Sequence, residues 1–299
     1  MNIFMTGATG YIGGTIARRL LDDGHRLRGL VRDAGKGRTL ASFGVEPVIG
    51  GLDDTALLAA EAKRADAVIN AANSDHRGAV EAFLEGLAGS NKAFIHTSGS
   101  SIVADDAKGD VASDRIYDED TPFEPVPGKQ ARVAIDRTIR AASDRGVRAV
   151  VVCPTMIYGN GLGLARDSAQ IPGLAKLARA AGRVRHVGKG LNIWSNVHVE
   201  DVADLYRLAL AKAPAGAFYF AENGEASYRD ICEAIARRLG LGAPQPWPFE
   251  EAAKELGESS AAYTFGSNSR VRGTRSRREL GWQPKHGSAT DWIEAELSL

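Results

Sequence analysis

The chain has 299 residues, of which 44% are hydrophobic and 25% charged, a balance typical of a folded globular protein and not of a disordered or fibrous one. Its 37 basic residues are matched by 37 acidic residues, so no overall charge favours nucleic acid or an anionic membrane as a partner, and a small molecule is the better expectation. No secretion signal opens the sequence, charges interrupt every apolar run, and the two cysteines form no CxxC or Cys/His cluster, which predicts a cytoplasmic protein without disulfides or a metal site.

Short apolar or β-branched runs alternate with helical stretches in the first half, a pattern that indicates βαβ units and a parallel sheet. Strands are expected at residues 3–6, 26–31, 46–49, 67–70, 93–97 and 149–153. Between the first two, residues 12–23 place their apolar side chains on one face of a helix, which Gly24 ends.

Beyond Pro154 the pattern changes to glycine-rich loops, with helices expected over 174–181, from Glu200 and Asp201 onward, and over 228–239. A strand at 217–221 is expected to return to the main sheet, and residues 243–248 are interpreted as a stiff proline-rich connector. The sequence therefore predicts residues 1–155 as one domain and residues 156–299 as a small substrate lobe, interleaved with the last strand and helices of the sheet.

A glycine-rich turn follows the first strand and opens the first helix. Gly7 allows a tight turn, Gly10 lets backbone amides approach a pyrophosphate, and Gly13 allows the helix to pack closely on the strand. The phosphates would meet free N–H groups at the start of the helix. The turn predicts a Rossmann-type, doubly wound α/β fold that binds a nicotinamide dinucleotide through residues Gly7, Thr9, Gly10, Tyr11, Ile12 and Gly13.

The end of the second strand bears on the choice of cofactor, because an acid there binds the ribose 2′-hydroxyl of NAD whereas an arginine accommodates the 2′-phosphate of NADP. Arg32 comes first, and Lys36 and Arg38 follow, which favours NADP. Asp33 keeps NAD open, as does the alternative that Arg32 is only a solvated surface residue.

Five further segments resemble the extended short-chain dehydrogenase/reductases, the superfamily of NAD-dependent epimerases and dehydratases, over essentially the whole chain. They are residues 50–54 (GGLDD), 71–73 (AAN), 154–159 (PTMIYG), 196–203 (NVHVEDVA) and 279–284 (ELGWQP). The resemblance implies that Leu52 contacts the adenine, that Ala71 and Asn73 form a turn beside the cofactor, and that Pro154 and Met156 line the nicotinamide. It also implies a homodimer formed through a pair of helices.

The catalytic pattern of that family is not present. The family uses a Ser or Thr together with Tyr-x-x-x-Lys, and these positions correspond here to Gly99, Gly128 and Arg132. Glycine cannot donate a proton, and a guanidinium stays protonated, although Arg132 could still bind ribose hydroxyls. Lys129 neighbours the tyrosine position but is rotated by about 100° around the helix. The chain therefore resembles the atypical members that lack the usual active-site residues.

Other side chains could replace the missing ones. Ser98 and Ser100 are candidates to orient a substrate carbonyl, since hydroxyls at the carboxyl end of a strand face the crevice where such sheets bind ligands. Tyr158 and Tyr117 are candidate proton donors, the latter from a loop that could act as a lid. Trp194 and Asn196 would line the substrate side. The alternatives are ordinary packing roles for the two tyrosines, Trp194 and Asn196, and His96 and His198 are interpreted as structural residues.

Three functions follow from these residues. An NAD(P)-dependent oxidoreductase of a small carbonyl, alkene or imine, with a non-standard proton donor, is favoured. A cofactor-retaining epimerase or dehydratase and a non-catalytic dinucleotide-sensing protein are the alternatives. The arginines within residues 270–278 are interpreted as a solvated face, with a clamp for an anionic substrate as the alternative.

Overall fold

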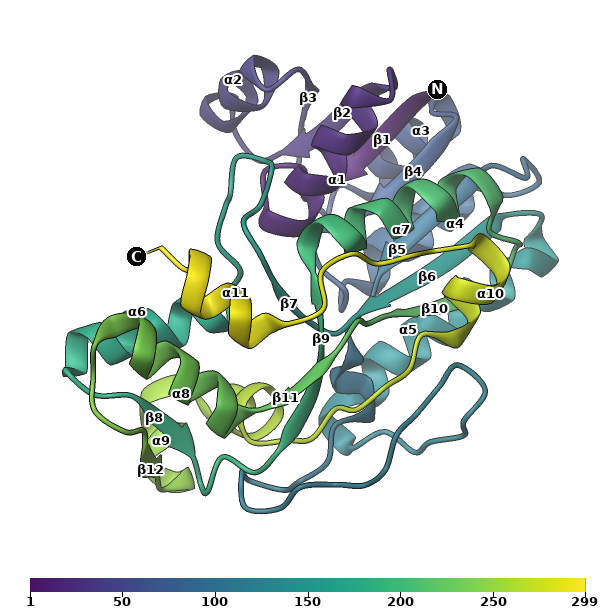
Figure 1. The fold of residues 1–299 in the computed structure, drawn as a ribbon. Helices are drawn as coiled ribbons and strands as arrows, with labels where there is room; N and C mark the ends of the chain where they lie inside the picture. Colours follow the sequence, from purple (N-terminus) through teal and green to yellow (C-terminus); the bar gives the residue numbers. More distant parts are fainter. Residues whose placement is uncertain (299) are drawn as a thin grey trace.

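A seven-stranded parallel sheet forms the centre of the protein in the computed structural model, which describes residues 1–298 (Figure 1). The strands lie in the order β10-β6-β5-β4-β1-β2-β3. Their bounds are β1 Asn2–Thr6, β2 Arg26–Val31, β3 Glu46–Ile49, β4 Ala67–Asn70, β5 Ala93–Thr97, β6 Arg148–Pro154 and β10 Ala217–Ala221. The order changes direction between β1 and β4, and ligands of such sheets bind beside that point, at the carboxyl ends of the strands.

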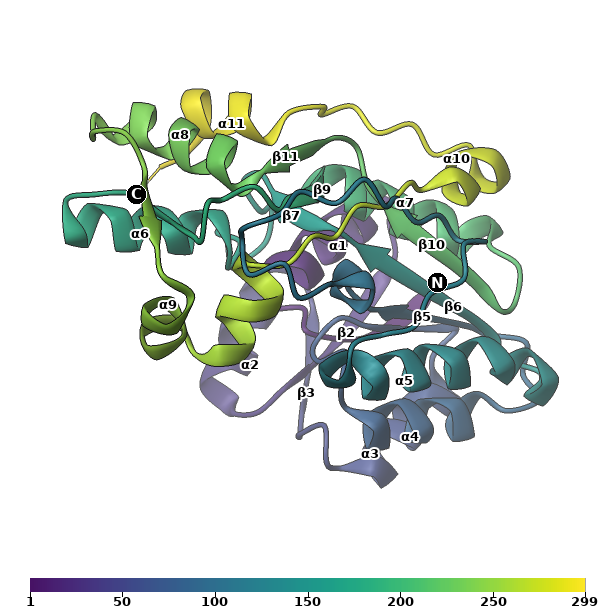
Figure 2. The same ribbon diagram turned by 90° about the horizontal axis from the view of Figure 1, so that it is seen from below.

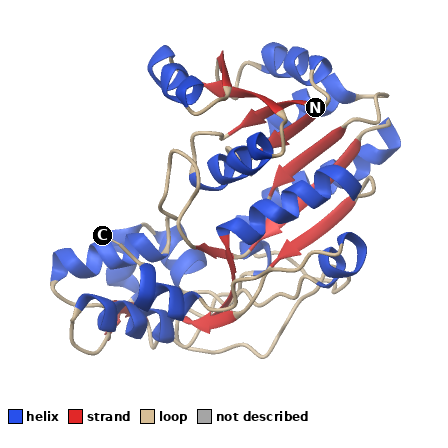
Figure 3. Cartoon of the chain, turned by 45° about the horizontal axis from the view of Figure 1, so that its top comes forward, coloured by secondary structure: helices blue, strands red, loops and turns tan. Residues whose placement is uncertain are grey.

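Helices cover both faces of this sheet (Figures 2 and 3) and bury most of strands β1, β4, β5, β6 and β10. The helices α1 (Tyr11–Asp22) and α7 (Val199–Lys212) share one hydrophobic core with one face of the sheet. On the opposite face the core is formed with α3 (Thr55–Arg64), α4 (Arg77–Leu87) and α5 (Gln130–Arg140). A short helix, α2 (Ala34–Ser42), lies against β3 at the edge.

A smaller lobe lies beyond the carboxyl edge of the sheet and has its own core (Figure 1). Its small sheets pair β11 (Glu225–Ser227), β9 (Ile193–His198) and β7 (Met156–Tyr158), and β12 (Gln245–Trp247) with β8 (Arg185–Val187). Its helices are α6 (Ile171–Ala181), α8 (Tyr228–Leu239), α9 (Phe249–Leu256) and α11 (Ala289–Glu296). The remaining elements are α10 (Thr274–Leu280), the 3₁₀ turns η1 (Ser100–Val103), η2 (Pro127–Lys129) and η3 (Ala141–Arg145), and the π-helical turn η4 (Ser260–Phe265).

The predicted α/β class is confirmed, and the strand expected at 217–221 does return to the main sheet, where it pairs with β6. Two details were wrong. The region beyond Pro154 is not only loops between helices, because β7 and β9 pair there, and residues 243–248 are not a plain connector, because β12 pairs with β8. No helix within residues 1–298 is long and apolar enough to cross a membrane.

Candidate active site

The glycine turn after β1 has a geometry that only glycine permits at two positions. Gly7 has a φ of 75°, and a Cβ there would lie 2.4 Å from the carbonyl oxygen of Ala71. A Cβ on Gly13 would lie 2.3 Å from the carbonyl oxygen of Gly7, so α1 approaches the turn closely because that side chain is absent. The Gly10 amide closes the turn by donating to the Gly7 carbonyl at 2.8 Å.

This turn forms one wall of a cavity of about 410 Å³ at the carboxyl ends of the strands. Six of the residues predicted to bind the cofactor line it: Gly7, Thr9, Gly10, Arg32, Leu52 and Ala71. The helix α1 begins at the cavity with no side-chain cap and no acidic residue in its first turn. Its first amides and its dipole therefore favour an anion, so the residues present fit the pyrophosphate of a dinucleotide.

The other predicted cofactor residues lie outside the lining of this cavity. Tyr11 donates its hydroxyl to the Gly159 carbonyl at 2.8 Å, which ties α1 to the chain after β7, and Ile12 packs against the core. The Asn73 side chain accepts the amide of Asp75 at 2.9 Å. Pro154 ends β6, and Met156 is fully buried in the core of the lobe.

Arg132 faces the turn after β4. Its guanidinium binds the Asp75 carboxylate with two hydrogen bonds of 2.8 and 2.5 Å, and a Cβ on Gly99 would lie 3.4 Å from it. Hydrogen bonding from Arg132 lowers the pKa of Asp75. The face of α5 that carries Arg132 therefore lies toward the ends of β4 and β5. Asp75 is a partner of Arg132 that the sequence analysis did not identify.

Ser98 and Ser100 are buried and each has a protein partner. The Ser98 hydroxyl donates to Asp136 at 2.7 Å, and Ser100 accepts the hydroxyl of Ser269 at 2.9 Å. Burial raises the pKa of Asp136 to about 7, although the hydrogen bond from Ser98 lowers it. Asp136 was also missed from sequence, where it reads as one more charge in an amphipathic helix.

Both candidate tyrosines are held by contacts with other parts of the chain. Tyr158 is 1% exposed in the core of the lobe, where its ring lies against His198 and Trp292, and burial raises the pKa of its phenol. Tyr117 is held by backbone bonds, from its amide to the Arg270 carbonyl and from the Arg272 amide to its own carbonyl. That pairing joins the backbone of Tyr117 to the C-terminal segment.

The remaining candidates, Trp194, Asn196 and His96, are buried. Trp194 and Asn196 are buried in the lobe, and the indole of Trp194 donates to the Ser267 carbonyl at 2.7 Å. His96 is fully buried in β5, bonded to Asn70, and burial lowers its pKa to about 4.

Residues 270–278 carry five arginines, and each has a carboxylate partner within 4 Å. Arg270 and Arg272 both bind Glu225, and the other three pairs are Arg275–Asp120, Arg277–Glu222 and Arg278–Glu279. This neutralisation disfavours a clamp for an anionic substrate in this run.

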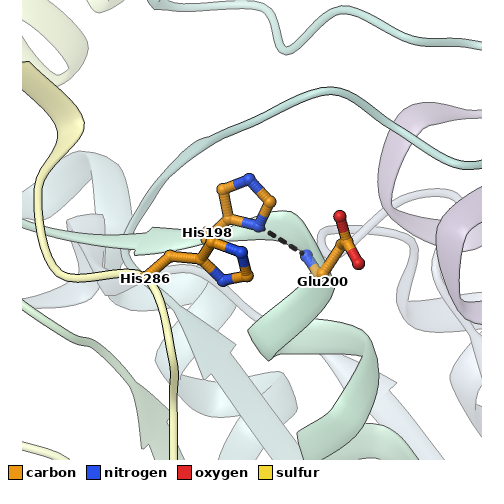
Figure 4. A group of neighbouring side chains, drawn as sticks. All are labelled: His198, Glu200 and His286. Carbon is orange, nitrogen blue, oxygen red and sulfur yellow. Dashed lines mark hydrogen bonds between the residues drawn. The ribbon is translucent and has the colours of Figure 1, made fainter. Parts of the chain in front are cut away.

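His198, Glu200 and His286 form a cluster in which possible ligand atoms lie within 4.8 Å of one another (Figure 4). The two imidazoles stack at 3.8 Å, and His198 caps α7 by accepting the Glu200 amide. Burial, and then His286, lower the pKa of His198 to about 4. Because Glu200 also pairs with Arg19 at 2.5 Å, and His286 with Asp201 at 3.1 Å, we interpret the cluster as a structural cap.

Comparison with known proteins places this geometry in a family. The family model described as "NAD dependent epimerase/dehydratase family" matches residues 3–219. An oxidase of Acremonium sp is 31% identical over 94% of this chain and 92% of its own, and a quinoline-oxide ketoreductase of Stigmatella aurantiaca is 26% identical over 94% and 92%. The dTDP-glucose 4,6-dehydratase of Bacillus anthracis, solved with NAD, has the same fold, with a TM-score of 0.77 at 18% identity over 98% of this chain and 94% of that one. The chain therefore belongs to the NAD-dependent epimerase/dehydratase family.

Proposed function

We propose that the protein is an NADP(H)-dependent oxidoreductase of a small carbonyl, alkene or imine. Residues 1–155 would hold the dinucleotide, and the lobe of residues 156–299 would hold the substrate. The oxidase and ketoreductase among its relatives support a redox reaction. A cytoplasmic location and a homodimer remain predictions from the sequence alone.

The end of β2 carries the preference for NADP. Asp33, the residue that could bind the ribose hydroxyl of NAD, is the N-cap of α2, where its carboxylate accepts the Lys36 amide at 2.8 Å. It does not line the cavity beside the glycine turn, whereas Arg32 and Lys36 do. Two cations without a competing acid in that wall favour a 2′-phosphate over a 2′-hydroxyl.

Parallel calorimetric titrations with NADPH and NADH test this proposal. We expect NADPH to bind at least tenfold more tightly, and we expect a panel of carbonyl, alkene and imine substrates to include one that consumes the reduced cofactor. If neither dinucleotide binds, the proposal is wrong. Dinucleotide that stays bound through purification would support the epimerase or dehydratase instead, and reversible binding with no turnover of any substrate would support the sensing protein.

A further inference from the structure

A tyrosine from the C-terminal part of the chain lies over η2, the turn that leads into α5. A Cβ added to Gly128 would lie 3.0 Å from Cε2, 3.2 Å from the hydroxyl oxygen and 3.3 Å from Cζ of Tyr263. These are the atoms at the tip of the phenol. The tip of Tyr263 therefore occupies the space into which a side chain at position 128 would begin to extend.

This position lies just before Arg132, which contacts the turn after β4. Gly128 lies in η2, the 3₁₀ turn that leads into α5, and Arg132, in the first turn of α5, reaches Asp75 in the turn after β4. Ala71 and Ala72, a few residues earlier in the same turn, line the cavity beside the glycine turn. The phenol of Tyr263 thus lies beside η2, a few residues before Arg132, whose guanidinium reaches the turn that borders the dinucleotide cavity.

A lysine ammonium accompanies the phenol. Lys129 Nζ lies 5.0 Å from the centre of the Tyr263 ring. Burial, and then the charge of Arg132, lower the pKa of Lys129, while the charge of Asp75 raises it. Lys129 therefore lies close enough to Arg132 and Asp75 to interact with both charges. A cation at this distance stabilises a phenolate more than a phenol.

The backbone around Tyr263 is firmly held, but its hydroxyl is not engaged. The carbonyls of Tyr263 and Phe265 accept hydrogen bonds from Ser267 at 2.9 Å and Asn192 at 3.0 Å, and Tyr228 donates to the Thr264 carbonyl. Tyr263 is partly exposed, and within residues 1–298 its hydroxyl makes no hydrogen bond, which leaves it available to a ligand. The turn η4 that carries it, drawn in yellow-green beside α9 in Figure 2, is π-helical, a form often found at functional sites.

We propose that Tyr263 is the proton donor of this enzyme, with Lys129 as the cation that stabilises its phenolate. The inference rests on the proposed function, in which a bound reduced nicotinamide dinucleotide supplies a hydride. As the carbon of a substrate carbonyl forms its new C–H bond, the C=O π pair moves to oxygen. Tyr263 donates its phenolic proton to that oxygen, Lys129 stabilises the phenolate that remains, and water reprotonates it.

The first test follows Tyr263 itself and needs no turnover. Phenolate absorbance is titrated against pH in the wild type and in Tyr263→Phe, and the difference gives the ionisation of Tyr263. We expect NADP⁺ to move that ionisation to lower pH by about one unit, because its nicotinamide ring is cationic, and Lys129→Met to move it to higher pH. An ionisation that responds to neither change would overturn the proposal.

The second test measures catalysis with a carbonyl substrate found in the panel. Tyr263→Phe should lower kcat by at least about 100-fold, the usual effect of removing a general acid, while the calorimetric Kd for NADPH stays within about twofold. The matched control is Tyr219→Phe, which removes a phenol hydroxyl that donates to Glu279 on α10. Retention of wild-type kcat by Tyr263→Phe would refute the donor role. If the wild type turned over no substrate, the proposed function would be wrong. The titration would then still show whether Tyr263 lies close to Lys129 and to a bound dinucleotide.

Discussion

At the scale of single residues, the charge of the cavity wall depends on which side chains already bind other parts of the protein. Asp33 is occupied as the cap of α2, which leaves Arg32 and Lys36 as the charged residues of the cavity wall. Both cations are exposed, so we expect any contribution they make to binding to come from direct contact with a phosphate and to be weakened by salt.

Replacing Arg32 tests this assignment. Arg32→Ala should weaken the binding of NADPH by about tenfold, since one charge-assisted contact to the 2′-phosphate is lost, and should leave NADH binding unchanged. Calorimetry with both dinucleotides measures the effect. Arg64→Ala, an exposed arginine at the end of α3, is the control and should change neither affinity. Equal losses for NADPH and NADH would show that Arg32 does not read the 2′-phosphate.

At the scale of elements, the contact between α1 and the turn after β1 depends on the absence of a side chain at Gly13. Gly13→Ala would place a Cβ 2.3 Å from the Gly7 carbonyl oxygen, so α1 must shift away from the turn. We expect a loss of about 1–3 kcal/mol in the free energy of unfolding and a fall of more than tenfold in dinucleotide affinity.

The matched control for this change is Gly173→Ala in α6, where an added Cβ meets nothing within 4 Å. Alanine there should leave dinucleotide affinity unchanged and raise stability by up to about 1 kcal/mol, because alanine is the better helix former. Denaturant unfolding and calorimetry measure both variants. Unchanged affinity in Gly13→Ala would mean that the spacing of α1 from the turn does not set the phosphate site.

The contact between β5 and α5 makes the stability depend on pH. The pKa of Asp136 is raised to about 7 in the folded protein, mainly by burial, against about 3.9 in an unfolded chain. Between these values the folded state binds more protons, so the free energy of unfolding should fall as pH rises from 4 to 7, by at most about 1.4 kcal/mol per pH unit, and level off above 7.

Asp136→Asn removes this titration while keeping an oxygen that can accept the Ser98 hydroxyl. The variant should therefore gain stability relative to the wild type as pH rises, and should be the more stable of the two at pH 8. Urea unfolding of both proteins across this pH range measures the difference. Parallel curves would show that Asp136 ionises normally in the fold.

The elements differ in how far they could be predicted from sequence. The bounds of β2, β3, β4, β5 and β10 were predicted to the residue. For β4, β5 and β10 the reason is that buried parallel strands are short apolar runs between turns. Strands β7 and β9 were missed, since their pairing joins Met156 to Asn196 and the buried Ser195 and Asn196 break the apolar pattern. Likewise the sequence showed a missing side chain at Gly128, but only the fold could bring Tyr263 beside it.

At the scale of the whole molecule, the C-terminal segment returns from the sheet to the start of α7. The Trp282 indole donates to the Asp201 carbonyl at 2.9 Å, and the Asp201 carboxylate accepts the amides of Lys285 and His286 at 2.9 and 3.0 Å. Asp201 is 1% exposed, so these bonds are made away from water. The chain beyond them forms α11, which packs on α8, so one buried acid links the lobe to a helix of the main sheet.

Asp201→Asn should therefore destabilise the whole protein and not one element alone. Its amide can accept one of the two backbone donors but turns an N–H toward the other, at a cost of about 1–3 kcal/mol for the buried donor left unpaired. Thermal unfolding should remain a single transition, with a Tm lower by roughly 2 °C or more for each kcal/mol. The control is Asp204→Asn on the same helix, which loses only a partly exposed ion pair with Arg207 and should leave Tm nearly unchanged. If Asp201→Asn instead produced two separate transitions, the lobe and the sheet would be unfolding independently. The Asp201 carboxylate would then join two independently folding units and would not belong to one cooperative core.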